Sequence, residues 1–522
     1  MHSRSQHGCL TCRDKKVKCD ETHPRCQRCT RLDRECDYSA RVRKKYTRKH
    51  HQALSTPPTT TSTPNQAGQY PTGLLPQETI LSELDHEAIH YIRFIIAPRV
   101  DTRRPEYSGP AIIWTLSQKS PMVHHMLCAL GSMKLHHDLS FSISTDIPRR
   151  KSIATAHYGA ALRMLGCKID NLGQESETES DIEFVLATLW LMVSYELAHG
   201  DGTGEDLAVH LRGAAVLLQG RLPNRPCEVD GESGGGGGGY RITRLTAQLL
   251  LWIAMVDGSA ALSGFDATFN ALLEAGFDSD NGNKPTSRLE RFSLLQRHAT
   301  MVYHDVWGAE YPQSELIEDL QCSPIFCLQA ETGQLRYMLS TIAGRASSSH
   351  RADSKDRVDL GCALRDVERR YSELIASATL PELPSEGPQR RYVLNLRMVV
   401  PFFHAVVLLF HNLSNDRSSH SASSRRAVSE IMTLAFQAYI DQENNGVYRI
   451  AWPLFVAALE LDDLIHRAWA LERFAALAQE GENLRRAHAA LSLAFSRQTV
   501  EKRRIGYLEL LQDQQIMPFV LE

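Results

Sequence analysis

Apolar residues recur at helical spacing through most of the chain after residue 78. Ile182, Val185, Leu186 and Leu189 fall on one face of a helix, and the polar residues before them can cap it. The same pattern returns in three later stretches, at 245–256, 454–465 and 484–494. Alternation of apolar and polar residues, which is typical of strands, is scarce. We therefore predict a large all-α domain over residues 78–522.

The first 77 residues lack this pattern. Cysteines dominate residues 8–37, and a basic run follows them. Residues 52–77 are rich in Thr, Pro, Ser and Gln, a composition typical of a flexible linker. We therefore expect four segments: a small cysteine-rich domain at 8–37, a basic linker at 38–51, a disordered linker at 52–77 and the helical domain at 78–522.

Six cysteines follow the spacing C-x2-C-x6-C-x6-C-x2-C-x6-C, which is one unit written twice. They are Cys9, Cys12, Cys19, Cys26, Cys29 and Cys36. Pairs of thiolates two residues apart are a metal-binding arrangement. One tetrahedral zinc takes four sulfurs, whereas two zincs can share six if two thiolates bridge both ions. The spacing therefore predicts a binuclear cluster with two zinc ions.

Two other interpretations of these cysteines stay open on the sequence alone. A disulfide framework needs an oxidising compartment, and residues 1–7 lack the apolar core of a signal peptide. A single zinc held by the two C-x2-C pairs would leave Cys19 and Cys36 unexplained at matching offsets. The binuclear cluster explains all six positions.

The formal net charge of −3 hides an asymmetry along the chain. Residues 1–51 hold 15 Lys and Arg against 6 Asp and Glu, a formal +9, so the remainder carries −12. A cationic arm on an acidic body is typical of a protein that binds a polyanion at one end. Binding through such an arm weakens steeply with salt, because it releases counterions from phosphates.

The residues that fill the cysteine spacing are basic. Four of the six residues between Cys12 and Cys19 are cations: Arg13, Lys15, Lys16 and Lys18. With the cysteine spacing, this segment resembles the fungal-type six-cysteine binuclear zinc cluster, a DNA-binding module of transcription factors. The resemblance implies two short helices and loops, with Cys9 and Cys26 bridging the two zincs. It also implies that the first helix enters the major groove of double-stranded DNA at a CGG triplet.

The resemblance assigns roles to the basic residues by position. Lys16 would contact the guanines, and Lys15 would assist through its backbone. Arg13 and Lys18 would hold phosphates without reading sequence. The basic run 41–49 would add phosphate contacts and signal nuclear import, unless it is only a solvated linker; its cations include Arg43, Lys44 and Lys45.

Four phrases in the helical domain resemble a second family, the fungal-specific transcription factor domain of the second type. They are Leu207 to Leu218, Trp252 to Gly264, Val306 to Pro312 and Trp452 to Trp469. This resemblance implies a helical regulatory domain that receives a signal or contacts co-regulators. Together the two resemblances imply a nuclear regulator of RNA polymerase II genes, not an enzyme, that controls a metabolic pathway or gene cluster.

Members of the zinc-cluster family often carry a short coiled coil after the cluster. No sustained apolar heptad occurs between residues 37 and 77. A homodimer and the spacing of DNA half-sites therefore stay open. The sequence also leaves open the target genes, the inducer and the choice between activation and repression.

One motif points to a different chemistry. His86, Glu87 and His90 form an H-E-x-x-H pattern, which on a helix can bind zinc for a metalloprotease. The extended form of that motif needs a glycine where Arg93 stands. We expect instead an ordinary first helix that begins at Asp85.

A zinc-dependent protein-interaction module that never touches DNA is a further alternative function. The paired histidines at 124–125 and 136–137 are expected at the surface or at helix ends, not in a metal site. The longest apolar stretch, Met398 to Phe410, carries Pro401 and is shorter than the roughly 18–20 residues of a membrane helix. We therefore expect no membrane partner.

Overall fold

The computed structural model divides the chain into two compact units, residues 1–71 and 72–522. In the first unit it describes residues 9, 11–12, 17, 19–22, 25–32 and 36. In the second it describes residues 82–139, 147–170, 179–200, 204–218, 242–265, 268–277, 287–345, 353–413 and 422–522. The predicted linkers at 38–51 and 52–77 lie outside these described residues.

The N-terminal unit is small and built around its cysteines. Its described helix is α2, Gln27–Arg31, and Thr11 and Cys12 are also helical. Cys26 is the N-cap of α2, and its side chain accepts a hydrogen bond from the backbone of Cys29. Five cysteines form the buried cluster of this unit. Local metal-ligand spacing, not an apolar core, therefore organises this part of the chain.

The second unit is the body, and every regular element among its described residues is helical. Its first half contains α3 (Glu83–Tyr91), η1 (Ile92–Ile96), α4 (Ala97–Val100), η2 (Pro105–Tyr107), α5 (Gly109–Ser117), α6 (Pro121–Leu139), α7 (Ile147–Asp170), α8 (Glu179–His199), α9 (Glu205–Leu218), α10 (Arg244–Leu262), α11 (Phe269–Phe277), α12 (Arg288–Ala299), α13 (Val302–Trp307) and η3 (Gly308–Glu310). Its second half contains α14 (Gln313–Arg345), α15 (Asp353–Arg370), α16 (Ser372–Ser377), α17 (Pro388–Asn412), α18 (Ala422–Tyr448), α19 (Ala451–Leu459), α20 (Leu464–Leu477), α21 (Glu482–Glu501) and α22 (Tyr507–Leu511). The predicted all-α body is confirmed.

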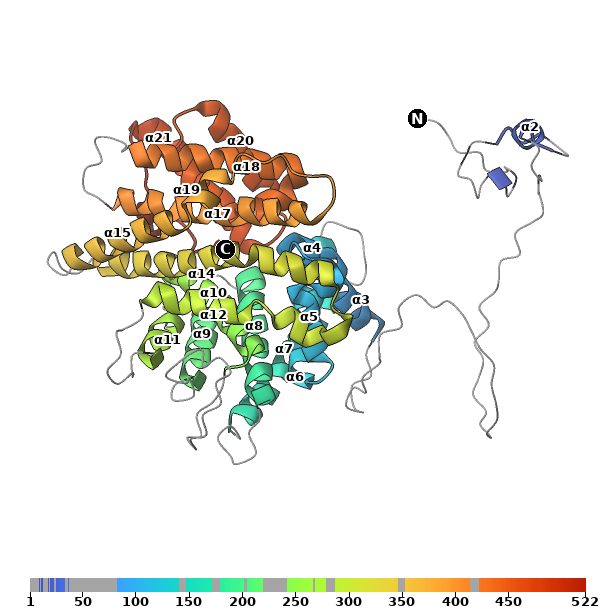
Figure 1. The fold of residues 1–522 in the computed structure, drawn as a ribbon, viewed down its shortest axis with the longest axis horizontal. Coiled ribbons are helices and arrows are strands. Elements are labelled where there is room, and N and C mark those ends of the chain that lie inside the picture. The colour runs from blue at the N-terminus through green and yellow to red at the C-terminus, as the bar shows by residue number, and fades with distance from the viewer. Residues whose placement is uncertain are drawn as a thin grey trace. The chain divides into compact units, whose positions relative to one another are not determined.

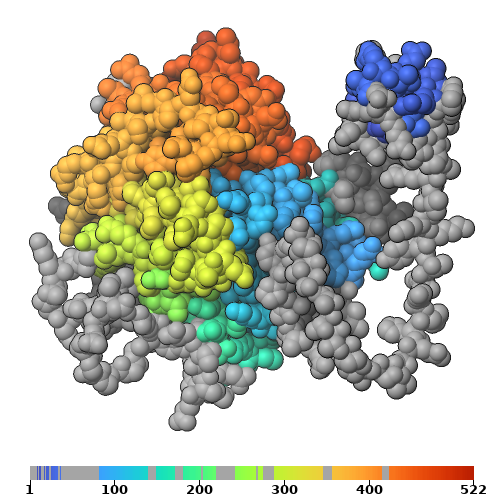
Figure 2. Space-filling view, turned by 45° about the vertical axis from the view of Figure 1, so that its right-hand side comes forward, coloured from blue at the N-terminus to red at the C-terminus, as the bar shows by residue number. Residues whose placement is uncertain are grey.

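The body contains two hydrophobic clusters that meet along α14. Most side chains of one cluster come from α3 through α13, and most of the other come from α14 through α22. Leu262 of α10 and Leu289 of α12 belong to the second cluster, and Ala330 of α14 belongs to the first. The helix α14 packs against α10 and α12 on one side and against α15 and α17 on the other. In Figure 1 it runs across the middle of the body, between the green helices below and the orange helices above. In the space-filling view the light-blue segments of the body adjoin both the yellow and the orange ones (Figure 2).

Two close approaches between helices depend on glycine. A Cβ atom at Gly131 in α6 would lie 2.4 Å from the backbone oxygen of Ala88 in α3, so only glycine fits there. A Cβ atom at Gly258 in α10 would lie 3.3 Å from the backbone oxygen of Gly333 in α14. These contacts bring α3 against α6 and α10 against α14.

One predicted helical stretch is interrupted. The apolar pattern at 454–465 suggested continuous packing, but α19 ends at Leu459 and α20 begins at Leu464. Asp463 caps α20, and its carboxylate accepts a hydrogen bond from the backbone N–H of Ile465 at 3.0 Å. Leu464 and Ile465 are 73% and 77% exposed, so the pattern overstated the buried face.

Three helical segments of the body are long and apolar enough to cross a membrane, judged by length and composition. They are Ser180–His199, Arg244–Leu262 and Pro388–Asn412. The expectation that no stretch approaches this length was therefore wrong on that criterion. Of their most apolar windows, 50%, 78% and 72% are buried inside the body, where the segments supply core side chains.

Candidate metal centre and DNA-binding unit

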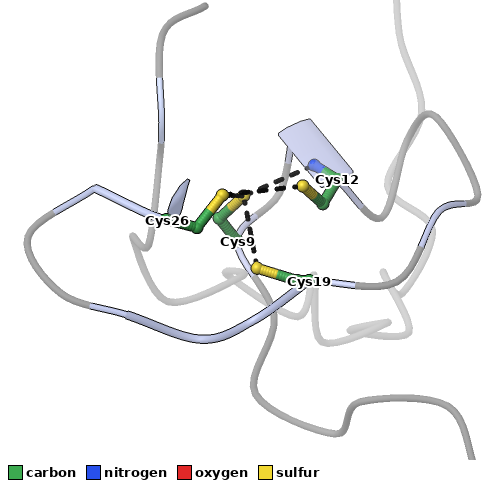
Figure 3. A group of neighbouring side chains, drawn as sticks. All are labelled: Cys9, Cys12, Cys19 and Cys26. Atoms are coloured by element: carbon green, nitrogen blue, oxygen red, sulfur yellow. Dashed lines mark hydrogen bonds between the residues drawn. The ribbon is translucent and has the colours of Figure 1, made fainter. Parts of the chain in front are cut away.

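The structure brings all six N-terminal cysteines together. Their sulfurs form two groups of four, in each of which all the sulfurs lie within 4.8 Å of one another. One group is Cys9, Cys12, Cys19 and Cys26, which Figure 3 shows pointing toward a common centre. The other is Cys9, Cys26, Cys29 and Cys36. Only Cys9 and Cys26 belong to both groups, as expected of sulfurs that bridge two metal ions.

The distances between sulfurs fit tetrahedral zinc. A Zn–S bond of about 2.3 Å places two sulfurs of one tetrahedron about 3.8 Å apart. The Sγ atom of Cys9 lies 3.8 Å from that of Cys26, 3.8 Å from that of Cys29 and 3.9 Å from that of Cys19. The Sγ atom of Cys12 lies 3.7 Å from that of Cys26 and also 3.9 Å from that of Cys29, across the two groups. The donor set therefore suits two zinc ions.

The sequence repeat reappears as a repeat of hydrogen bonds. The backbone N–H of Cys12 donates to the sulfur of Cys9 at 3.4 Å, and that of Cys29 donates to the sulfur of Cys26 at 3.3 Å. In each cysteine repeat, the first turn of a helix thus points a backbone N–H group at the sulfur that belongs to both groups of four. Such bonds stabilise negative charge on these two atoms.

The last cysteine of each cysteine repeat also accepts a backbone hydrogen bond. The N–H of Glu21 donates to the sulfur of Cys19 at 3.5 Å. The N–H of Cys26 donates to the sulfur of Cys36 at 3.2 Å, which links the start of the second cysteine repeat to its end. These contacts fix the direction of the terminal sulfurs around the centre.

The electrostatics of the six clustered cysteines favour a bound cation. Desolvation raises the pKa of the Cys9 and Cys12 thiols and raises that of Cys29 to about 12. For Cys26, burial acts in the same direction, but hydrogen bonds from Cys29 and from the neighbouring thiols lower its pKa to about 6. Six thiolates this close together would repel one another strongly. Two zinc ions would hold all six in the deprotonated form, because a coordinating thiol loses its proton to the metal.

Asp20 is a positioning residue that the sequence did not reveal. Its Oδ1 accepts a hydrogen bond from the backbone N–H of Gln27 at 3.1 Å, and its Oδ2 accepts one from Arg28 at 3.3 Å. Hydrogen bonds from Thr22 and Gln27 lower the pKa of this carboxyl to about 2. The loop between the two units thereby caps α2. An aspartate directly after the third cysteine was the only available signal.

Comparisons with known proteins bear on both units. The model of the fungal Zn(2)-Cys(6) binuclear cluster domain matches residues 7–45. The model of the fungal specific transcription factor domain matches residues 105–511, which is most of the chain. The chain belongs to the fungal Zn(2)-Cys(6) transcription factors. Members of this family bind DNA and two zinc ions and are not enzymes.

Individual relatives match only over a short stretch. Transcription factor lfc1 of Flammulina velutipes is 62% identical over 37 residues, which are 7% of this chain and 13% of that protein. Transcriptional regulatory protein moc3 of Schizosaccharomyces pombe is 56% identical over 34 residues, 6% of this chain and 7% of that protein. The chain therefore spans a small part of the length of these relatives. No solved structure matches it significantly.

The alternatives for the cysteines are disfavoured by the geometry of this zinc-cluster protein. Sulfur separations of 3.7–3.9 Å are far from the S–S bond length of about 2.05 Å. None of the described cysteines forms a disulfide. A single zinc on the two C-x2-C pairs would leave out Cys19 and Cys36, which lie in the same two sulfur groups.

The residues proposed to touch DNA lie outside the described part of the chain. They are Arg13, Lys15, Lys16, Lys18, Arg43, Lys44 and Lys45. Their roles stay predictions. Among the described basic residues of the cluster, Arg25, Arg28 and Arg31 are exposed, so the unit presents cations to solvent.

The H-E-x-x-H residues have other partners. His86, Glu87 and His90 are all exposed, and they are absent from the metal-ligand clusters of the described residues. Glu87 pairs with Arg150 at 2.5 Å, and the ring of His90 lies 4.9 Å from that of Phe94. The helix begins at Glu83 and not at Asp85, because Ser82 and Asp85 form a capping box. The arrangement offers no protease site.

One further cluster of potential ligands lies between α3, α6 and α7. It consists of Asp85, Cys128 and His157. The Nε2 atom of His157 lies 3.0 Å from Asp85 Oδ1, and its Nδ1 atom lies 2.7 Å from Nδ1 of His125. These polar atoms thus satisfy one another. His124, expected at the surface or at a helix end, lies near the start of α6 but is only 2% exposed and is part of this interior.

Proposed function

We propose that this protein is a sequence-specific regulator of RNA polymerase II genes that acts in the nucleus and reads CGG half-sites. The observation that carries the proposal is the pair of sulfur tetrads that share Cys9 and Cys26. This donor set fits a binuclear cluster, and the family match extends through the regulatory body. The six cysteines are the proposed zinc ligands.

The metal is proposed to act as structure and not as a reagent. Bound zinc would neutralise the thiolates and fix the fold of residues 8–37. The chain's own part is to orient the sulfurs through backbone N–H groups and to cap α2 through Asp20. The helix that includes Thr11 and Cys12 would then present the basic residues after it to the major groove.

Sequence reading is proposed to rest on one side chain. Lys16 would donate hydrogen bonds to guanine O6 and N7 in the CGG triplet. Lys15 would assist through its backbone, while Arg13, Lys18, Arg43, Lys44 and Lys45 would hold phosphates and fix the register. The formal +9 of residues 1–51 would supply the salt-dependent part of the affinity.

The biological setting is proposed from relatives and from the body. One relative, 51% identical over 37 residues, is the aspercryptin biosynthesis cluster-specific transcription regulator atnN of Emericella nidulans. We infer by analogy that this protein controls a metabolic pathway or gene cluster. Its helical body would contact co-regulators, and the oligomeric state on DNA would set the spacing of half-sites.

The test compares two lysines on duplexes that differ in one triplet. Lys16→Ala should cost about 1–3 kcal/mol of discrimination between CGG and a scrambled triplet, measured by fluorescence anisotropy with the full chain. Lys18→Ala is the matched control, and it should weaken binding to both duplexes by the same factor. If Lys16→Ala instead weakened binding to both duplexes equally, Lys16 would be a phosphate contact. Equal binding of CGG and scrambled duplexes by the unaltered protein would refute sequence-specific reading, and binding of neither duplex would favour the protein-interaction module.

A further inference from the structure

The body encloses a cavity at the junction of its two hydrophobic clusters. Its volume is about 370 Å³, which lies within the range of about 300–1,000 Å³ typical of small-molecule sites. Helices of the first cluster, among them α6, α8 and α10, form one wall. Helices of the second, among them α14, α17 and α21, form the other. The lining is mostly apolar and includes Ile96, Leu130, Trp190, Met255 and Phe402.

The charged residues of this cavity are unbalanced. Four cations line it against two carboxylates: Arg99, Lys134, Arg336 and Arg449 against Glu480 and Glu522. Glu480 is already paired with Arg99 at 2.6 Å. The side chain of Arg449 donates its hydrogen bonds to Gln442 and to the backbone oxygens of Pro98, Arg99 and Asp101. The second carboxylate, Glu522, faces Arg336. Among the described residues, Lys134 is therefore the lining cation with neither a carboxylate partner nor a hydrogen bond.

Lys134 projects from α6 into the cavity without a partner. Among the described residues it makes neither an ion pair nor a hydrogen bond, and burial lowers the pKa of its ammonium group. Glu480 and Arg99, the charged groups that act on the Lys134 ammonium, already pair with each other. A partly buried ammonium group without a counter-ion is costly, and an anion beside it would relieve that cost.

Arg336 in α14 is a second cation, which donates its hydrogen bonds to neutral groups and also faces the carboxylate of Glu522. Its Nη1 donates to the hydroxyl of Ser259 at 2.7 Å, and its Nη2 donates to the backbone oxygen of Leu521 at 2.8 Å. The guanidinium group also lies 3.8 Å from the ring centroid of Trp452. Its Nε atom and the Oγ1 atom of Thr332, another lining residue, are buried without a hydrogen-bond partner among the described residues. The cavity thus combines an apolar surface with unsatisfied polar groups.

We propose that this cavity binds a small amphipathic organic acid. The apolar body of the ligand would fill the space between the two clusters, and its carboxylate would pair with Lys134. A molecule held there touches both halves of the body, so its binding would stabilise their junction. The site lies within residues 72–522, and its occupancy can be measured whether or not the protein reads CGG.

The test measures binding of octanoate and of octanol to the full-length, zinc-loaded protein by isothermal titration calorimetry. The two probes share an apolar chain and differ in the carboxylate. Octanoate should bind roughly ten- to hundredfold more tightly than octanol, because a hydrogen bond to a charged group is the stronger kind. Failure of octanoate to bind, or equal affinity for the two probes, would overturn the proposal.

Four variants test whether the two probes bind in this cavity. Lys134→Met should remove the preference for octanoate and leave octanol binding unchanged, and Lys134→Arg should restore the preference. Ser194→Phe, which fills the cavity from α8, should abolish binding of both probes. Lys119→Met is the matched control, since Lys119 is exposed and lies outside the lining. A Lys134→Met protein that folds normally and still prefers octanoate would also contradict the proposal.

Discussion

Replacement of Asp257 should destabilise the body more than most single substitutions do. Asp257 lies in α10 with no exposed surface, and it accepts three hydrogen bonds. These come from the backbone N–H of Phe269 at 3.0 Å, from the backbone N–H of Asn270 at 2.9 Å and from Asn270 Nδ2 at 2.9 Å. Asn270 in turn accepts a hydrogen bond from Gln334 of α14 at 2.8 Å. One carboxylate therefore caps α11 and links it to α10 and α14.

The expected loss of stability follows from the hydrogen-bond donors that lose their acceptor when Asp257 is replaced. Each buried donor without a partner costs about 1–3 kcal/mol, and Asp257→Ala leaves the backbone N–H groups of Phe269 and Asn270 without this acceptor. We expect Asp257→Ala to lower the free energy of unfolding by about 3–5 kcal/mol. Asp257→Asn keeps one acceptor oxygen and should lose about 1–3 kcal/mol. Against a total stability of about 5–15 kcal/mol, the first change is severe.

The assay is urea unfolding of the full chain, followed by the helical circular dichroism signal of the body. Asn270→Ala and the double variant close a mutant cycle, whose coupling energy should be about 0.5–3 kcal/mol because the two residues touch. A loss below about 1 kcal/mol for Asp257→Ala, or strict additivity with Asn270→Ala, would refute this account of the cap.

Three further predictions concern other parts of the molecule. Chelation of zinc should unfold residues 8–37 and abolish DNA binding while leaving the helical signal of the body intact; a parallel loss of both signals would contradict the separation of the two units. Burial, with a smaller effect of Arg426, lowers the pKa of His404 to about 4, below the unfolded value of about 6.5. At this residue the unfolded chain then binds more protons between pH 6.5 and 4, so the contribution of His404 to stability should fall as the pH drops through this window, by up to about 1.4 kcal/mol per pH unit. His404→Gln should reduce the slope of stability against pH by that amount in unfolding titrations. Gly131→Ala should cost about 1–3 kcal/mol in thermal unfolding, because its Cβ meets Ala88, whereas Gly166→Ala in α7 has free space and should be neutral or stabilising.

The sequence predicted the features that depend on short-range spacing. The repeat of cysteines two and six residues apart fixed the metal-binding unit, because each C-x2-C pair shares one turn. The shared membership of Cys9 and Cys26 in both sulfur groups agrees with the bridging role that the family resemblance implied. Helical periodicity likewise located α8 and α10, since one buried face repeats every three to four residues.

Features that depend on distant partners were not predictable. Asp257 and Asn270 are 13 residues apart, and Gln334 lies 64 residues beyond Asn270. No local pattern marks such a network. The burial of His124 was not predictable for the same reason: it results from the packing of α3 and α7 against α6. The cavity also arises from helices far apart in the chain, so periodicity shows its lining only as apolar helix faces.

Selection from a random library of DNA duplexes by the full-length, zinc-loaded protein shows whether the cysteine cluster reads CGG triplets. We expect CGG triplets to be enriched over successive rounds, with a spacing between them that reports the oligomeric state on DNA. Enrichment of sequences without CGG, or no enrichment at all, would contradict this expectation.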